Sequence, residues 1–214
     1  MDAITRVPVP VNEPVKSYAP GSPERAEIEA ALVSATSAEP AELTGTFGAE
    51  RRPGTGADRY EVRMPSDHGT VLGVVQQASH ADAQQAIDAA LAAAPDWAAL
   101  PFDQRAAVFL RAADLIAGPY RARINAATML GQAKTVQQAE IDSACELIDF
   151  LRFNAHFAQD IYANQPLNSA GVWNRMDYRP LEGFVYAITP FNFTAIAGNL
   201  PTSAALMGNP VLWK

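Results

Sequence analysis

The chain has 214 residues, of which 49% are hydrophobic and 18% charged, so it can bury a sizeable core. Its formal charge of −7 and its pI of about 4.9 exclude a general nucleic-acid surface, because binding to phosphates requires a basic face. The sequence contains no uninterrupted stretch of about 18 apolar residues, which argues against a membrane span.

The cysteine and histidine content bears on the cellular compartment of the protein and on metal binding. Cys145 is the single cysteine, so the chain cannot form an internal disulfide, and we expect a reducing compartment such as the cytoplasm. The three histidines are scattered and predict no metal site. The first ten residues, MDAITRVPVP, resemble neither a secretory signal nor an amphipathic presequence, so we expect no targeting peptide.

The first 77 residues divide into two parts. Residues 1–39 are predicted to form a Pro-rich extended arm followed by a helix. Ser22, Pro23 and Glu24 mark the helix start, because serine can cap, proline suits the first turn and an acid favours the positive end of the dipole. From residue 40, β-prone runs alternate with turn residues. We expect antiparallel strands over residues 43–47, 60–64 and 71–75.

Helices dominate the next stretch, and residues 40–164 together are assigned to the N-terminal part of a larger domain. Ser79 with Asp82, and Thr135 with Gln138, each predict a capping box at a helix start. The helix after Ser79 is expected to end near Pro95, and the one after Thr135 to continue unbroken for about 27 residues. The expected helices cover residues 79–95, 102–117, 120–132 and 135–162.

Residues 165–181 interrupt the helices with asparagines, prolines and a glycine, and a strand is predicted over 172–178. Residues 182–214 then contain two apolar runs, GFVYAIT and PVLWK, separated by a helical stretch. Strand, helix and strand in this order predict a right-handed βαβ unit and an α/β fold.

Ligands of such a sheet bind at the carboxyl ends of its strands, where Thr189 and Lys214 are expected to lie. The pattern by itself leaves a nucleotide site open, because the segment has no Gly-rich fingerprint.

Two motifs in the last segment, TPFNF at residues 189–193 and GNPVLWK at 208–214, resemble the aldehyde dehydrogenase family. WAALPFDQRAAVFLRAADLIA at residues 97–117 is similar to the same family. Three longer stretches resemble one branch, the pyrroline-5-carboxylate dehydrogenases; they cover residues 12–25, 139–158 and 180–214. The resemblance implies an aldehyde dehydrogenase-like α/β fold that includes the N-terminal part of a Rossmann-type NAD-binding domain. It also implies NAD-dependent oxidation of L-glutamate γ-semialdehyde to glutamate in proline catabolism.

The resemblance further assigns roles to five residues. It implies that the amide of Asn192 donates to the oxyanion formed when a thiolate attacks the aldehyde. Lys214 is matched with the lysine that reaches the adenine ribose of NAD, and Thr189 with a residue that touches the cofactor. Glu146 would receive the α-ammonium of the substrate, and Phe193 would pack against its aliphatic chain.

Plainer interpretations of four of these residues need no ligand. Asn192 would cap the helix that follows it, which is a common position for asparagine. Lys214 would be a strand-end lysine that reaches for water. Thr189 would be an ordinary strand residue, and Phe193 an ordinary core residue.

Glu146 also has a plainer interpretation. It follows Asp142 by four residues and precedes Asp149 by three, so the three acids form one stripe on a helix. Such a stripe is typical of a solvated helix face, whereas the resemblance implies that Glu146 faces the substrate.

In this family the nucleophilic cysteine and the general-base glutamate follow the region corresponding to Lys214, and Cys145 lies too far upstream to be that nucleophile. We therefore expect the 214 residues alone to be poorly soluble or molten and to oxidise no aldehyde, because the last strand would leave an open apolar edge. Another aldehyde dehydrogenase and a non-catalytic truncated module are the alternatives. The resemblance implies a homo-oligomer in which residues 165–181 form a contact strand, and it leaves open an association with proline dehydrogenase.

Overall fold

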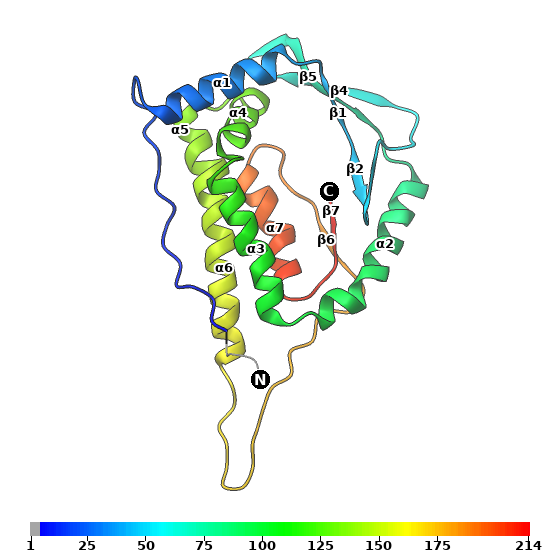
Figure 1. Ribbon diagram of the computed structural model, residues 1–214. Coiled ribbons are helices and arrows are strands. Elements are labelled where there is room, and N and C mark those ends of the chain that lie inside the picture. Colours follow the sequence, from blue (N-terminus) through cyan, green and yellow to red (C-terminus); the bar gives the residue numbers. More distant parts are fainter. Residues whose placement is uncertain (1–4) are drawn as a thin grey trace.

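In the computed structural model, which describes residues 5–214, an extended arm runs beside a group of helices, with small sheets at their flanks (Figure 1). The first four residues of the predicted arm lie outside the described part. Within residues 5–214, no helix is both long and apolar enough to cross a membrane. The same residues contain no group of three or more His, Cys, Asp or Glu side chains that could hold a metal ion.

The helices predicted from the sequence are present, and two capping boxes stand where they were expected. The helical elements are α1 (Pro23–Ser37), α2 (His80–Ala99), α3 (Phe102–Ala117), α4 (Arg121–Gln132), α5 (Val136–Ala139), the π-helix η1 (Glu140–Cys145), α6 (Glu146–Ala163) and α7 (Thr194–Leu206). Ser22 caps α1 by accepting from the N–H of Arg25. Ser79 and Thr135 form the capping boxes of α2 and α5.

Two details of the helices differ from the prediction. Helix α2 continues through Pro95 to Ala99. Its last turn is stabilised by a contact with α7, because the indole N–H of Trp97 donates to the carbonyl of Ala205 at 2.8 Å. The long helix expected from Thr135 onward is interrupted by η1, whose wider turns no local propensity signals.

The strands are β1 (Ala41–Leu43), β2 (Gly45–Phe47), β3 (Glu50–Arg52), β4 (Arg59–Met64), β5 (Asp67–Gln76), β6 (Val185–Ala187) and β7 (Val211–Trp213). The order β1-β5-β4 makes one sheet, in which β4 and β5 are antiparallel as predicted but β1 and β5 are parallel. The run predicted at 43–47 therefore splits between two sheets. Gly48, at a φ of 61°, makes the turn by which β2 pairs with β3.

The strand predicted over residues 172–178 does not form a ladder within the described chain. One isolated bridge joins Ser169 and Val172. Side chains satisfy nearby backbone N–H groups instead: Asn168 accepts from Asn174, and Gln165 accepts from Met176, each at 2.7 Å. The segment is an extended loop that projects from the lower end of the molecule (Figure 1).

The expected strand–helix–strand unit is present at the end of the chain. Strands β6 and β7 are parallel, with Val185 opposite Val211 and Ala187 opposite Trp213, and α7 connects them. Helix α7 packs on α6 and α3 around an apolar core. A Cβ on Gly198 of α7 would lie 2.5 Å from a methyl group of Leu147, so glycine permits this close approach.

The C-terminal end of α7 is held by two donors from the segment that resembles the family at residues 97–117. Trp97 donates to Ala205, and the buried guanidinium of Arg105 donates through Nε to the carbonyl of Leu206 at 3.1 Å. A cation at the carbonyl end of a helix also favours its dipole. These contacts fix α7 along its axis, and with it the loop at its N-terminal end.

Candidate active site

The carboxyl ends of β6 and β7 lie side by side, as the sequence predicted. The N–H and the hydroxyl of Thr189 both donate to the carbonyl oxygen of Lys214, each at 2.8 Å. The N–H of Lys214 donates to the carbonyl of Ala187, also at 2.8 Å. The ammonium side chain of Lys214 is exposed at this edge, so it is free to reach a ligand placed over the strand ends.

Asn192 lies in the loop between β6 and α7, and its side chain is exposed. Helix α7 begins at Thr194 with Phe193 as the N-cap residue, and no side chain caps it. The interpretation of Asn192 as the helix cap is therefore wrong. Its amide is displayed near the positive end of α7, where negative charge is favoured.

The acidic stripe is not a solvated face. Asp142 is buried and forms an ion pair with Lys134. Asp149 accepts from the backbone N–H of Glu13 and from the side chain of Asn12, both at 2.7 Å, and so holds the N-terminal arm. Glu146, between them, is half-buried and belongs to no ion pair within residues 5–214.

Lys134, which no sequence motif indicated as a site residue, connects three of the predicted site residues. Its ammonium donates to the main-chain oxygen of Asn192 at 2.7 Å and lies 4.9 Å from the centre of the Phe193 ring. Burial lowers the pKa of Lys134, and the nearby carboxylate of Glu146 acts in the opposite direction. One signal was present in the sequence: a lysine directly before a helix start opposes the helix dipole.

A second set of contacts fixes the first residue of α7. The hydroxyl of Thr194 lies 3.1 Å from that of Thr128 on α4 and accepts from the amide of Gln132 at 3.0 Å. Thr128 also pairs with Ser143 of η1 at 2.6 Å. The C-terminal end of the loop that carries Asn192 is thus held to α4 directly, and to η1 through Thr128.

Cys145 has none of the properties of a nucleophile. It is a buried free thiol, 5% exposed, next to Arg121 and Glu140. Burial, together with the charge of Glu140, raises the pKa of the Cys145 thiol to about 12. The thiolate is the reactive form of cysteine, so this side chain stays inert near neutral pH.

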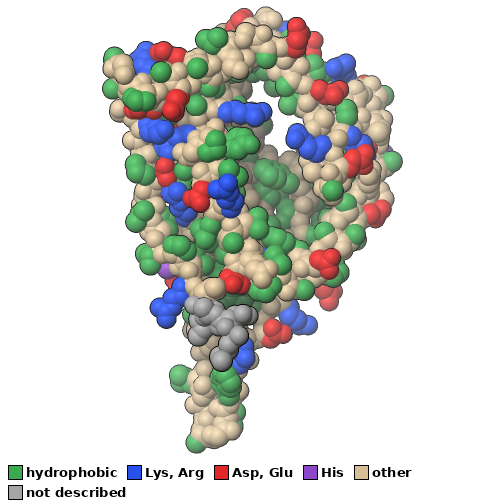
Figure 2. All heavy atoms as spheres, viewed as in Figure 1, with side chains coloured by type: hydrophobic (Ala, Val, Ile, Leu, Met, Phe, Trp, Pro, Cys, Tyr) green, Lys and Arg blue, Asp and Glu red, His purple; other side chains and the backbone are tan. Residues whose placement is uncertain are grey.

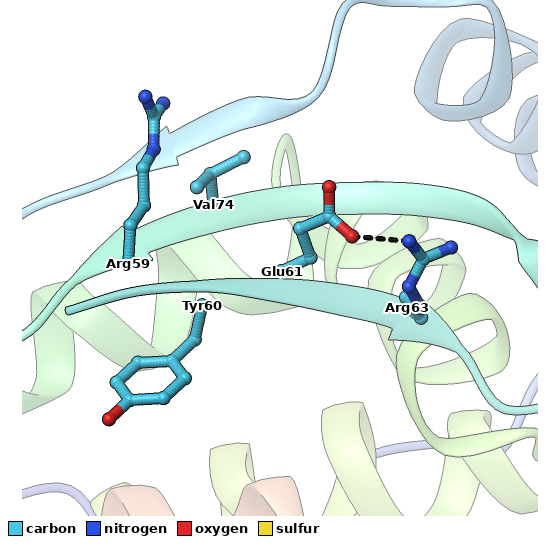
Figure 3. A pocket seen from close by; sticks show the side chains of 5 residues that line it. All are labelled: Arg59, Tyr60, Glu61, Arg63 and Val74. Atoms are coloured by element: carbon cyan, nitrogen blue, oxygen red, sulfur yellow. Dashed lines mark hydrogen bonds and ion pairs between the residues drawn. The ribbon is translucent and has the colours of Figure 1, made fainter.

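The surface has other concave regions. Figure 2 shows a hollow between the helices and the side formed by α2 and the strands. A shallow depression on β4 and β5 is lined by Arg59, Tyr60, Glu61, Arg63 and Val74 (Figure 3). Glu61 is already paired with Arg63, and Tyr60 points to the opposite side of the sheet from Arg59, so the polar groups do not converge on one point.

The sequence pattern of the aldehyde dehydrogenase family matches residues 52–214. The chain belongs to the aldehyde dehydrogenase family. The matched region contains all five residues for which the resemblance implied roles: Glu146, Thr189, Asn192, Phe193 and Lys214.

Named relatives agree on one branch of the family. The aldehyde dehydrogenase chain is 48% identical over 213 residues to the delta-1-pyrroline-5-carboxylate dehydrogenase of Agaricus bisporus, covering 99% of this chain and 39% of that protein. It is 47% identical over 209 residues to the mitochondrial enzyme of that name from Homo sapiens, covering 95% of this chain and 36% of that protein.

A solved structure is also similar over the whole chain. The delta-pyrroline-5-carboxylate dehydrogenase from Mycobacterium tuberculosis, bound with NAD, superposes with a TM-score of 0.96 at 61% identity. The match covers 100% of this chain and 39% of the Mycobacterium chain. The aldehyde dehydrogenase chain therefore spans about two fifths of the length of these relatives.

Proposed function

We propose that this chain forms part of an NAD-dependent enzyme that oxidises L-glutamate γ-semialdehyde to L-glutamate. The observation that carries the proposal is the half-buried carboxylate of Glu146, which has no ion-pair partner in residues 5–214. An amino-acid aldehyde brings an ammonium group that needs such a partner, because a charge leaving water must be paired. The names of the relatives point to the same substrate.

The positions of the remaining residues support the roles proposed for them. When a nucleophile adds to the aldehyde, the carbonyl oxygen gains negative charge, and the exposed amide of Asn192 can donate to it. The positive end of α7 favours the same charge. Phe193 is half-buried against the core and offers an apolar wall to the carbon chain of the substrate.

The edge formed by β6 and β7 is proposed to receive the adenosine portion of NAD. The Lys214 ammonium is exposed there and can donate to a ribose diol, and the Thr189 backbone lies beside it. Bound NAD would supply the acceptor for the aldehyde hydride. The NAD-bound Mycobacterium structure supports this cofactor.

Two alternatives remain distinguishable. A different aldehyde dehydrogenase, acting on an aldehyde without an amino group, would leave Glu146 without a partner for its charge. A non-catalytic module would form no NADH in any context.

We also propose a homo-oligomer, in which the projecting loop contributes to subunit contacts. Its apolar side chains are strongly exposed, with Leu167 at 91% and Trp173 at 78%. Association with proline dehydrogenase stays a proposal from the family resemblance alone. A cytoplasmic location is proposed from the reduced Cys145, with the mitochondrion as the alternative suggested by the name of the human relative.

NADH formation by the complete protein tests the proposed function. With NAD present, L-glutamate γ-semialdehyde is expected to be oxidised with a kcat/KM at least about tenfold above that of a matched aldehyde lacking the amino group, because the charged contact to Glu146 is lost. Absorbance at 340 nm follows the reaction. Equal values for the two aldehydes would support the different-aldehyde alternative, and no NADH from either would support the non-catalytic module.

A further inference from the structure

We propose that Lys134 is a positioning residue that holds the Asn192 loop in its working geometry and neutralises Asp142, the buried acid four residues before Glu146 on the same stripe. The proposal rests on the proposed function for its catalytic readout, but its structural part stands independently. Lys134 is not among the residues for which the family resemblance implied a role.

The geometry shows how one ammonium group serves both purposes. Lys134 donates to the main-chain oxygen of Asn192 at 2.7 Å and lies over the Phe193 ring at 4.9 Å. These residues are consecutive, so a single side chain fixes the loop through its backbone and through an aromatic face. The amide of Asn192 takes no part in this contact and remains available to a ligand.

The same ammonium neutralises the neighbouring acid of the stripe. Asp142 is buried and pairs with Lys134, while its second carboxylate oxygen, Oδ1, has no hydrogen-bond partner in the described chain. Without Lys134, this buried carboxylate would be unpaired and would repel the charge on Glu146. The pairing with Lys134 therefore neutralises Asp142, the buried acid next to Glu146 on the stripe.

The backbone around Lys134 is shaped for this position. Ala133 adopts the left-handed conformation at a φ of 52°, where residues other than glycine are strained, and this turn separates α4 from α5. Thr135 directly follows as the cap of α5. Lys134 thus sits between two fixed helix ends, and its side chain, 19% exposed, leaves from a rigid point.

The test replaces Lys134 in the complete protein by methionine, which keeps the length of the side chain and removes its charge. We expect kcat with L-glutamate γ-semialdehyde to fall about tenfold, the usual scale for losing a hydrogen bond to a charged group, while the KM for NAD is unchanged. Hydrogen exchange of the peptide 188–194 is expected to become faster. Lys16→Met is the matched control: within residues 5–214 the Lys16 ammonium forms a single ion pair, with Glu27 at 3.9 Å, and the variant is expected to leave both readouts unchanged.

The double variant K134M/D142N separates positioning from charge neutralisation. If Lys134 holds the loop, the double variant is more stable than Lys134→Met but keeps its low kcat and its fast hydrogen exchange. Lys134→Arg, which retains the positive charge, is expected to restore part of the kcat and part of the protection from exchange. Wild-type kcat and exchange in the double variant would overturn the proposal. If the wild-type protein oxidises no glutamate semialdehyde, the proposed function fails, and the exchange comparison alone decides the role of Lys134.

Discussion

Replacing Asn192 by alanine in the complete protein is expected to lower kcat for L-glutamate γ-semialdehyde by about 10²–10³, the usual effect of deleting one oxyanion donor. The amide stands exposed at the N-terminal end of α7, and its backbone is held by Lys134. Donation strengthens as the oxygen gains charge, so the loss falls on kcat more than on the KM for the aldehyde. Steady-state NADH formation measures both.

Two comparisons make the result of Asn192→Ala specific. Gln84→Ala, on the exposed face of α2, removes an amide that donates to Asp88 at 2.9 Å within that helix, and it is expected to leave kcat unchanged. The thermal midpoint of Asn192→Ala is also expected to stay close to wild type, because the residue does not cap α7. If Asn192→Ala instead kept the full kcat and lost about 1 kcal/mol of stability, as expected for the loss of a helix cap, Asn192 would be a structural residue.

The second large effect concerns Glu140, at the centre of a buried ion network. Glu140 is 0% exposed and pairs with the guanidinium of Arg121. It also accepts from the backbone N–H of Lys16 at 2.8 Å and from the hydroxyl of Tyr18 at 2.7 Å. Because Lys16 and Tyr18 belong to the N-terminal arm, one carboxylate fastens this arm to α4 and η1.

Replacing Glu140 by alanine is expected to destabilise the complete protein by about 3–5 kcal/mol, because Arg121 would remain as a buried charge with fewer partners. The midpoint of urea unfolding, followed by a probe in this part of the protein, measures the change. Glu61→Ala is the matched control: Glu61 pairs with Arg63 on an exposed strand, where an ion pair contributes about 0–1 kcal/mol. Equal losses in the two variants would show that the network does not hold the arm.

The same network also affects the stability of the protein in acid. Burial alone would raise the pKa of Glu140, but hydrogen bonds from Arg121, Lys16 and Tyr18 outweigh burial and hold the pKa below its usual range. A carboxylate whose pKa is lower in the folded than in the unfolded state stabilises the protein at pH values above the unfolded-state pKa, which is about 4.3 for glutamate. This contribution is lost as the pH falls from there through the lower folded-state pKa. In Glu140→Ala this part of the acid dependence should be absent.

Local signals predicted much of the fold. Ser22, Ser79 and Thr135 marked helix starts correctly, because a cap and its partner lie within three residues of one another. The parallel pairing of β1 with β5 and the length of α2 were missed. Both depend on contacts between distant residues, such as the bond from Trp97 to Ala205, which no local pattern encodes.

The site was predicted in the same uneven way. The order of strand, helix and strand placed Thr189 beside Lys214, because parallel strands bring their carboxyl ends to one edge. Helical spacing grouped Asp142, Glu146 and Asp149 on one stripe but could not tell that Asp142 is buried against Lys134. That contact joins the α4–α5 turn to η1 and forms only when the helices pack.

The most direct test of the proposed substrate site compares the complete wild-type protein with Glu146→Ala on two aldehydes. For L-glutamate γ-semialdehyde, the KM is expected to rise by roughly tenfold or more, since a hydrogen bond between charged groups is lost. For a matched aldehyde without the amino group, the KM is expected to stay the same or to fall. An unchanged KM for glutamate semialdehyde in Glu146→Ala would contradict the assignment of Glu146 as the ammonium receiver.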